Sequence, residues 1–233
     1  MADDGTLLFI YDGGVFRVAE GVQAPKAGSV FFARHLDVRE GDEVLDLGTG
    51  MGLTAILAAR VAKRVVATDI VPECVSVTRE NALLNGLGDR VEARVGDGYA
   101  PVRGMTFDLI ISNPPQMPTP PGLERDDWMA RADNGGFDGW AILDTIIRGA
   151  PEHLKPGGRL VFSIFEFLGL PRAQDKLRTA GLAPSVVAQE TQSFPRLGYE
   201  RLDHIRSLDT EGTVPKDTWP KTVERIILCG QKA

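Results

Sequence analysis

The tetrapeptide Asn113-Pro114-Pro115-Gln116 holds the side chains of this 233-residue sequence that are best placed to do chemistry. It directly follows the apolar run of residues 107–111. Two prolines fix φ and remove two backbone donors, so the chain leaves a strand stiffly and cannot begin a helix. What remains is the side-chain oxygen of Asn113 and the carbonyl of Pro114. Two acceptors directed at one point suit an –NH2 group; the alternative interpretation is a tight turn that only ends the strand.

A glycine loop forms the second candidate site. Gly48, Thr49, Gly50, Met51 and Gly52 follow the predicted strand 44–47 and precede a predicted helix. Glycines permit positive φ and let a ligand approach the backbone closely. The dinucleotide-binding pattern needs a third glycine where this sequence has Leu53. Asp46, just before the loop, would repel a pyrophosphate and instead suits a cation such as the amino group of an amino acid.

Acidic residues also end two further predicted strands. Asp69, next to Ile70, follows the strand 65–68 and can accept two hydrogen bonds from a ribose diol. Asp97, followed by Gly98, can accept from the exocyclic amine of adenine. Because ribose, adenine and an amino acid together describe S-adenosylmethionine, the sequence predicts this molecule as the cofactor.

Strands and helices alternate along the chain, which predicts a doubly wound, mostly parallel sheet. In such a sheet ligands bind at the carboxyl ends of the strands, where the candidate residues lie. The predicted strands are 44–47, 65–68, 91–95, 107–112, 159–165, 183–190 and 223–229. The predicted helices are 29–36, 54–62, 72–85, 140–153 and 171–180, and a hairpin is expected over 7–18.

The glycine loop, Asp69, Asp97 and Asn113-Pro114-Pro115, in this order and spacing, resemble the class I S-adenosylmethionine-dependent methyltransferases. Within that class the chain is similar to the release-factor glutamine methyltransferases, over roughly residues 12–190. The resemblance implies a seven-stranded Rossmann-like methyltransferase fold. It would form a single domain over 1–233, in which 1–40 is an N-terminal hairpin and helix extension and 191–222 is an insertion before the last strand. The closer likeness rests on residues 22–29, 113–120, 135–139 and 154–158.

The same resemblance implies a role for each matching residue. Asn113 and the Pro114 carbonyl would accept the two hydrogens of an amide or amine, and Ser29 would touch the methionine end of the cofactor. Gln116 stands where the family usually has an aromatic residue that stacks on a planar acceptor. An amide there favours a more polar or non-planar acceptor. The expected activity is therefore N-methylation of a protein glutamine or of a small amino compound.

Two long segments do not fit the compact pattern, and long loops inside a domain are usually functional or disordered. Residues 117–138 contain Trp128, and residues 191–222 contain Tyr199 and His204. We expect the first segment to form a lid or pocket wall. Trp128, Tyr199 and His204 are the predicted substrate contacts.

Composition limits the partners. A net charge of −6 and a pI of about 5.2 argue against a nucleic-acid substrate, which needs a basic face. We expect a cytoplasmic protein with no membrane segment, and Cys74 and Cys229 carry no metal-ligand pattern. The strand 91–95 has charges at alternate positions, which discourages pairing at a sheet edge, so no obligate activator subunit is expected.

Three other functions stay open from the sequence. Methylation of an exocyclic base amine in RNA or DNA suits the Asn-Pro-Pro loop and would require an extruded base. A nicotinamide-dependent reductase is disfavoured by Leu53 and Asp46. A regulatory protein that binds the cofactor without catalysis would have no use for Asn113-Pro114-Pro115.

Overall fold

The computed structural model describes residues 7–124 and 132–233. Its strands are β1 (Leu7–Tyr11), β2 (Gly14–Val18), β3 (Glu43–Leu47), β4 (Arg64–Asp69), β5 (Val91–Val95), β6 (Phe107–Ser112), β7 (Leu154–Phe165), β8 (Leu182–Ser193) and β9 (Thr222–Lys232). Its α-helices are α1 (Ala27–Ala33), α2 (Leu53–Ala59), α3 (Pro72–Leu84), α5 (Ala141–His153), α6 (Leu170–Thr179), α7 (Arg196–Glu200) and α8 (Leu202–Leu208). Two short 3-10 helices cover Ala100–Val102 and Glu166–Leu168.

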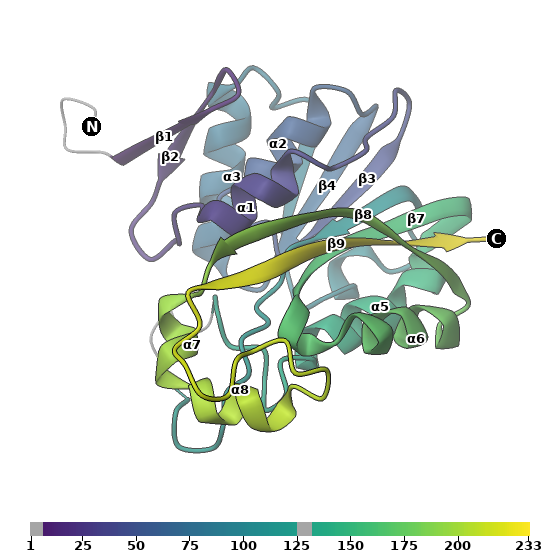
Figure 1. Ribbon diagram of the computed structural model, residues 1–233. Helices are drawn as coiled ribbons and strands as arrows, with labels where there is room; N and C mark the ends of the chain where they lie inside the picture. Colours follow the sequence, from purple (N-terminus) through teal and green to yellow (C-terminus); the bar gives the residue numbers. More distant parts are fainter. Residues whose placement is uncertain (1–6, 125–131) are drawn as a thin grey trace.

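Seven strands form the main sheet, in the order β5-β4-β3-β6-β7-β9-β8. The first five are parallel, and β9 runs antiparallel to both β7 and β8. Helices α1, α2 and α3 cover one face, and α5 and α6 cover the other (Figure 1). The predicted doubly wound, mostly parallel sheet is confirmed, as is the position of β5 at an edge.

Both faces of the central strands are apolar because helices cover both. In β6, Leu109 and Ile111 belong to the core on the α1–α3 side, whereas Ile110 belongs to the core on the α5–α6 side. The last residue of β6, Ser112, is polar but fully buried, and the first polar side chain that reaches beyond the core follows it. The candidate residue Asn113 is therefore the first residue after β6.

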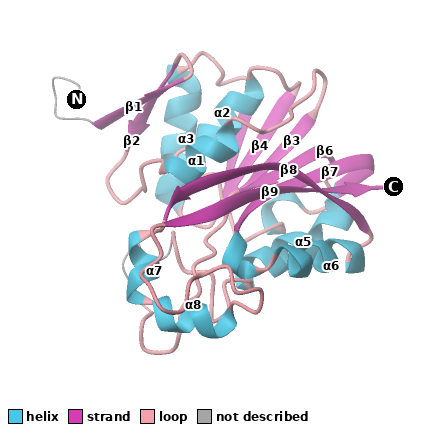
Figure 2. Ribbon diagram, in the orientation of Figure 1, coloured by secondary structure: helices cyan, strands magenta, loops and turns pink. Residues whose placement is uncertain are grey.

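The hairpin of β1 and β2 stands apart from the main sheet (Figure 2). Asn81 in α3 and Asn85, the C-cap residue of that helix, bind the hairpin edge as a third strand would. The Asn81 side chain accepts from the Arg17 N–H at 2.7 Å and donates to the Arg17 carbonyl at 3.0 Å, and Asn85 pairs with Val15 in the same way. Asn81 also donates to the carbonyl of Met51 at 2.9 Å. One buried amide thus joins the hairpin, α3 and the glycine loop.

Replacing Asn81 by Leu is expected to lower the free energy of unfolding by roughly 2–4 kcal/mol, because three hydrogen bonds are lost and their backbone partners, buried at Met51 and partly buried at Arg17, stay unpaired. Urea denaturation measures this change. The control is Glu80→Gln on the same helix, which only removes an exposed ion pair with Arg17 and should change stability by less than about 1 kcal/mol. An equal effect of the two substitutions would contradict the role given to Asn81.

The structure differs from the expected elements mainly near the C-terminus. Strand β8 continues to Ser193, and the segment expected as a loop contains α7 and α8. Leu202 and Ile205 are buried, which explains why this short stretch is helical. Strand β7 begins at Leu154, which pairs with Phe107, rather than at residue 159. Over the described ranges, none of the helices is long and apolar enough to span a membrane.

Candidate active site

Asn113 is fixed in direction by the strand beside it. Its Oδ1 atom accepts a hydrogen bond from Oγ of Ser163, in β7, at 2.6 Å. Just before it, the Ser112 hydroxyl donates to the Leu47 carbonyl of β3 at 2.7 Å. The half-buried Asn113 side chain therefore has one oxygen lone pair engaged by protein and one available at the carboxyl edge of the sheet.

Gln116 lies in a different environment from the expected one. Its side chain is only 3% exposed and turns into the sheet, where Nε2 donates to the carbonyls of Ser163 at 3.1 Å and Pro114 at 3.3 Å. Its Oε1 accepts from the Phe165 N–H at 2.8 Å. The side-chain amide is thus hydrogen-bonded within the protein through both its nitrogen and its oxygen. It ties the residues after Asn113 to the end of β7.

The predicted lid, residues 117–138, is described over 117–124 and 132–138, and the second part packs directly on the beginning of the first. The Met117 N–H donates to the Asp133 carbonyl at 2.9 Å, and the Gly135 N–H donates to the Met117 carbonyl at 3.0 Å. A Cβ at Gly135 would lie 2.6 Å from backbone atoms of Gln116, so only glycine permits this approach. Trp128, the predicted substrate contact in this segment, lies outside the described residues.

The glycine loop has the open backbone that a ligand requires. Gly48 and Gly50 have φ of 73° and 59°, and a Cβ at either position would meet no heavy atom within 4 Å. The N–H groups of Gly48 and Thr49 donate to the Thr68 carbonyl at 2.8 and 3.0 Å. Gly52 is tighter, since a Cβ there would lie 3.0 Å from Thr78. The loop thus presents bare backbone at the ends of β3 and β4.

Asp46 lies under this loop and is almost fully buried. The hydroxyls of Thr49 and Thr54 donate to its Oδ2 at 2.8 and 2.7 Å. Burial raises the pKa of Asp46 to about 6, and the two hydroxyls only partly oppose this rise. A cationic group beside this carboxylate would favour its ionised form.

Four other predicted cofactor residues, Asp69, Ile70, Asp97 and Gly98, lie at or just after the carboxyl ends of β4 and β5. Asp69 accepts from the N–H groups of Gly50 and Val71, both at 2.9 Å, and burial raises its pKa. Ile70 is 64% exposed, an apolar surface suited to a flat base. Asp97 is exposed and Gly98 half-buried after β5, and Ser29 is half-buried in α1.

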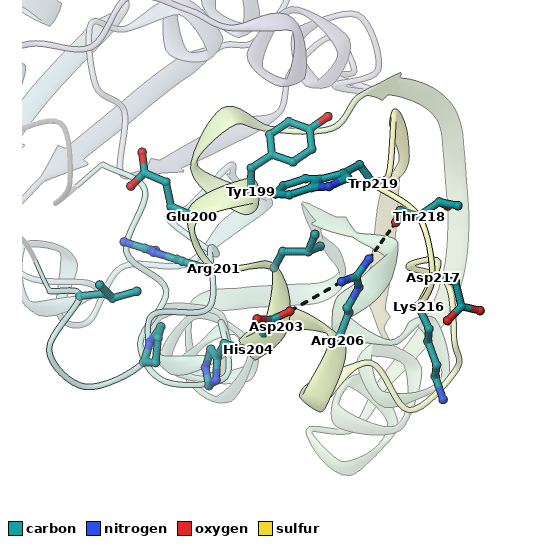
Figure 3. Close-up of a pocket in the computed structure, with 13 residues that line it drawn as sticks. Tyr199, Glu200, Arg201, Asp203, His204, Arg206, Lys216, Asp217, Thr218 and Trp219 are labelled. Atoms are coloured by element: carbon teal, nitrogen blue, oxygen red, sulfur yellow. Dashed lines mark hydrogen bonds and ion pairs between the residues drawn. The ribbon is translucent and has the colours of Figure 1, made fainter.

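Tyr199 and His204 line a hollow of about 400 Å³ between α7, α8 and residues 216–219 (Figure 3). The Tyr199 hydroxyl donates to the Pro220 carbonyl at 2.7 Å, and Nε2 of His204 lies 2.7 Å from the Phe137 carbonyl. Pro120 also lines the hollow, so it adjoins the far end of the Asn113 loop.

Arg201 connects that hollow to the loop, a connection that the sequence did not reveal. Its side chain is 3% exposed, and Nη1 donates to Oγ1 of Thr119 at 2.6 Å and to the Pro118 carbonyl at 3.3 Å. In the part of the chain that the structure describes, no group of His, Cys, Asp and Glu side chains is arranged to hold a metal ion.

Comparison with known proteins identifies the family of the chain. Residues 7–119 match the methyltransferase small domain. A putative protein N5-glutamine methyltransferase of Methanocaldococcus jannaschii is 32% identical over 177 residues, which cover 76% of this chain and 88% of that protein. A release factor glutamine methyltransferase of Aquifex aeolicus is also 32% identical, over 65% of this chain but only 58% of its own length.

Among solved structures, the Mtq2–Trm112 complex of E. cuniculi aligns over 91% of this chain and 99% of that chain, with a TM-score of 0.62. At 17% identity this likeness concerns the fold alone. The M. jannaschii tRNA m1G37 methyltransferase has the same fold, with a TM-score of 0.64 over 98% of this chain and 57% of that chain and 15% identity. The chain belongs to the class I S-adenosylmethionine-dependent methyltransferases.

Proposed function

We propose that this methyltransferase acts on an amide or amine nitrogen, either a glutamine side chain of a protein or a small amino compound. One observation carries the proposal. The Asn113 Oδ1 atom, held by Ser163, and the adjacent Pro114 carbonyl are two fixed acceptors at the end of β6. The names of the relatives, which are glutamine methyltransferases, support the glutamine side chain as the first candidate.

In the proposed reaction Asn113 and Pro114 accept the two hydrogens of the –NH2 group and thereby aim its lone pair. Bound S-adenosylmethionine supplies an electrophilic methyl group. The new N–C bond forms as the C–S bond breaks, and the proton leaves the nitrogen for water after transfer. An amide nitrogen is a poor nucleophile, so positioning, worth about 7–11 kcal/mol at its best, carries much of the rate.

The glycine loop and the acidic residues around it fit the cofactor. Open backbone at Gly48 and Gly50 allows close approach, and Asp46 offers a carboxylate to the amino group of the methionine part. Asp69 retains lone pairs on both oxygens for the ribose hydroxyls. We assign the exposed Ile70 to the adenine ring.

Acid is expected to weaken cofactor binding. Because the pKa of Asp46 is raised to about 6, its carboxylate is mostly protonated at pH 5 and must lose that proton to pair with the cofactor's amino group. The dissociation constant of S-adenosylhomocysteine should rise about tenfold between pH 7.5 and pH 5, as measured by calorimetry. In Asp46→Asn this dependence should fall to the part contributed by Asp69.

The raised pKa of Asp46 has the opposite effect on the stability of the cofactor-free protein, which is higher in acid. The folded-state pKa of Asp46 exceeds the ordinary value, so its contribution to stability is fully present below pH 4 and is lost as the pH rises through about 6. Thermal unfolding of the free protein should show this loss, and Asp46→Asn should remove it. A flat affinity profile in the unsubstituted protein would contradict the place given to Asp46.

The appended helices are proposed to receive the part of the acceptor that surrounds its nitrogen. Their hollow carries aromatic rings and charges of both signs, and Arg201 couples it to the loop after Asn113. Such a mixed surface suits a polypeptide. The Trp219 side chain is 69% exposed at its rim, beside Tyr199 (Figure 3).

We further propose that the enzyme works without an activator subunit. The free edge at β5 carries the exposed Glu92 and an ion pair from Arg94 to it at 2.8 Å, which disfavours pairing with another strand. Methyl transfer by the purified chain alone is the expected result, and transfer only after a second subunit is added would contradict it.

The proposed activity is tested by incubating the purified protein with a cytosolic extract and methyl-labelled S-adenosylmethionine, then separating protein, RNA, DNA and small molecules. Label in a protein, released on enzymatic digestion as methylated glutamine, is the expected result. Label in the small-molecule fraction identifies a small amino compound instead. Label confined to RNA or DNA would overturn the proposal.

A further inference from the structure

A buried arginine lies close to the Asn113 loop without a hydrogen-bond partner for two of its nitrogens. Arg225, in β9, is 8% exposed. Its Nε and Nη1 atoms are buried, and neither has an acceptor among the described residues. Leaving a charged donor buried and unpaired costs free energy, so this arrangement calls for a reason.

The guanidinium group of Arg225 stacks on an aromatic ring, and the edge formed by Nε and Nη1 has no hydrogen-bond partner among the described residues. The guanidinium carbon lies 3.9 Å from the ring centroid of Phe165, which covers one face. A Cβ at Gly28 of α1 would lie 2.5 Å from Nη2, so the absence of a side chain there makes room for the arginine. Helix α1 therefore contacts Arg225 through bare backbone.

The topology places Arg225 close to the Asn113 loop. Strand β9 is antiparallel, so its beginning lies at the carboxyl edge of the parallel strands. Arg225 pairs with Phe165, whose N–H binds Gln116 in the Asn113 loop. Only β7 separates β9 from β6, a distance of roughly 10 Å, whereas the cofactor loops follow β3, β4 and β5 on the other side of β6.

The two acidic residues near Arg225 form ion pairs with other basic residues. Asp133 is the acid whose charge acts on Arg225, but its carboxylate pairs with Lys26 at 3.0 Å. Glu190, opposite Arg225 on β8, pairs with Arg34 at 2.5 Å. Burial lowers the pKa of Arg225 to about 10, so the group stays charged at neutral pH.

We propose that Arg225 binds a carboxylate of the methyl acceptor, which makes it a specificity-determining residue for an acceptor that carries an anionic group beside its nitrogen. The inference rests on the proposed N-methylation. A planar guanidinium edge matches a carboxylate by two parallel hydrogen bonds. Asp133, whose charge acts on Arg225, is held in the exposed ion pair with Lys26. The methionine part of the cofactor has a carboxylate too, so the test separates the two sources.

The test compares the unsubstituted protein with Arg225→Met, Gly28→Ala and the control Arg178→Gln, an exposed arginine on α6. Glutaramate, which has an amide and a carboxylate, and its neutral diamide glutaramide serve as probes. Binding is followed by thermal shift in the presence of S-adenosylhomocysteine, and labelled methyl transfer is measured into the fraction that the unsubstituted protein labels. Cofactor binding is measured with S-adenosylmethionine and its decarboxylated form.

Arg225→Met should fold, because an apolar side chain of similar length replaces an unpaired buried charge. We expect it to lose the preference for glutaramate over glutaramide and to lower transfer about 10- to 100-fold at unchanged cofactor affinity, which is the size of a charge-assisted hydrogen bond. Gly28→Ala should do the same more weakly by displacing the guanidinium group.

The remaining outcomes are distinct. Loss of affinity for S-adenosylmethionine but not for its decarboxylated form would overturn the acceptor assignment and give the carboxylate to the cofactor. Unchanged probe preference and transfer in Arg225→Met would overturn the inference altogether. If the unsubstituted protein labelled only nucleic acid, the proposed function would fail, while the glutaramate shift would still report on Arg225.

Discussion

Replacing Asn113 by Ala is expected to lower the rate of methyl transfer about 100- to 1,000-fold, the range seen when one positioning hydrogen bond is removed from an active site. The substitution removes the only side-chain acceptor of the proposed pair and leaves the Pro114 carbonyl to hold the nitrogen alone. The affinity for S-adenosylhomocysteine should not change, because the glycine loop, Asp46 and Asp69 are intact. Single-turnover transfer and calorimetry measure the two quantities separately.

Ser163→Ala is expected to lower the rate of methyl transfer less than Asn113→Ala does. It keeps Asn113 but removes the 2.6 Å hydrogen bond that directs its Oδ1 atom. One hydrogen bond of about 1 kcal/mol corresponds to a loss of roughly fivefold in rate. Transfer at the full rate by Asn113→Ala would show that Asn113 has no part in the reaction. A larger loss of rate from Ser163→Ala than from Asn113→Ala would show that Ser163 does more than orient Asn113.

Gln116→Leu is expected to lower the free energy of unfolding by about 2–4 kcal/mol and to reduce transfer beyond what unfolding explains. Leucine fills the space but leaves the Ser163 carbonyl and the Phe165 N–H without a partner in a buried site. It also releases the Pro114 carbonyl from the amide that restrains it. Urea denaturation and transfer rates under fully folded conditions measure the two effects.

Gln189→Leu is the matched control, since Gln189 is exposed on the edge strand β8. It should change stability by no more than about 0.5 kcal/mol. If Gln116→Leu were as stable and active as the control, the hydrogen bonds of Gln116 would not hold the loop. If it kept its stability but changed its acceptor preference, Gln116 would contact the acceptor, as the motif first indicated.

The part of the fold that local pattern determines was predictable. Strands β3, β4 and β6 are short apolar runs followed by Gly or Asn-Pro or ending in Asp, and the alternation with helices predicts a mostly parallel sheet. The alternating charges of β5 predict its place at an edge. The positions of Asp46, Asp69 and Asn113 follow in turn, because parallel strands bring their carboxyl ends to one edge.

What the sequence did not reveal depends on contacts between distant segments. Nothing local shows that Gln116 turns toward β7, since its partners Ser163 and Phe165 are almost fifty residues away. Arg225 reaches the site because β9 runs antiparallel, which reverses the edge at which its first residues lie. The helices α7 and α8 are too short for a periodic pattern, and the burial of Leu202 and Ile205 decides them.

The most direct test of the account is the position of the transferred methyl group. The acceptor labelled from 13C-methyl S-adenosylmethionine would be purified and its product examined by NMR and mass spectrometry. The arrangement of Asn113 and Pro114 predicts a methyl group on an amide or amine nitrogen, present with the unsubstituted protein and absent with Asn113→Ala. A methyl group on oxygen or carbon would contradict the account.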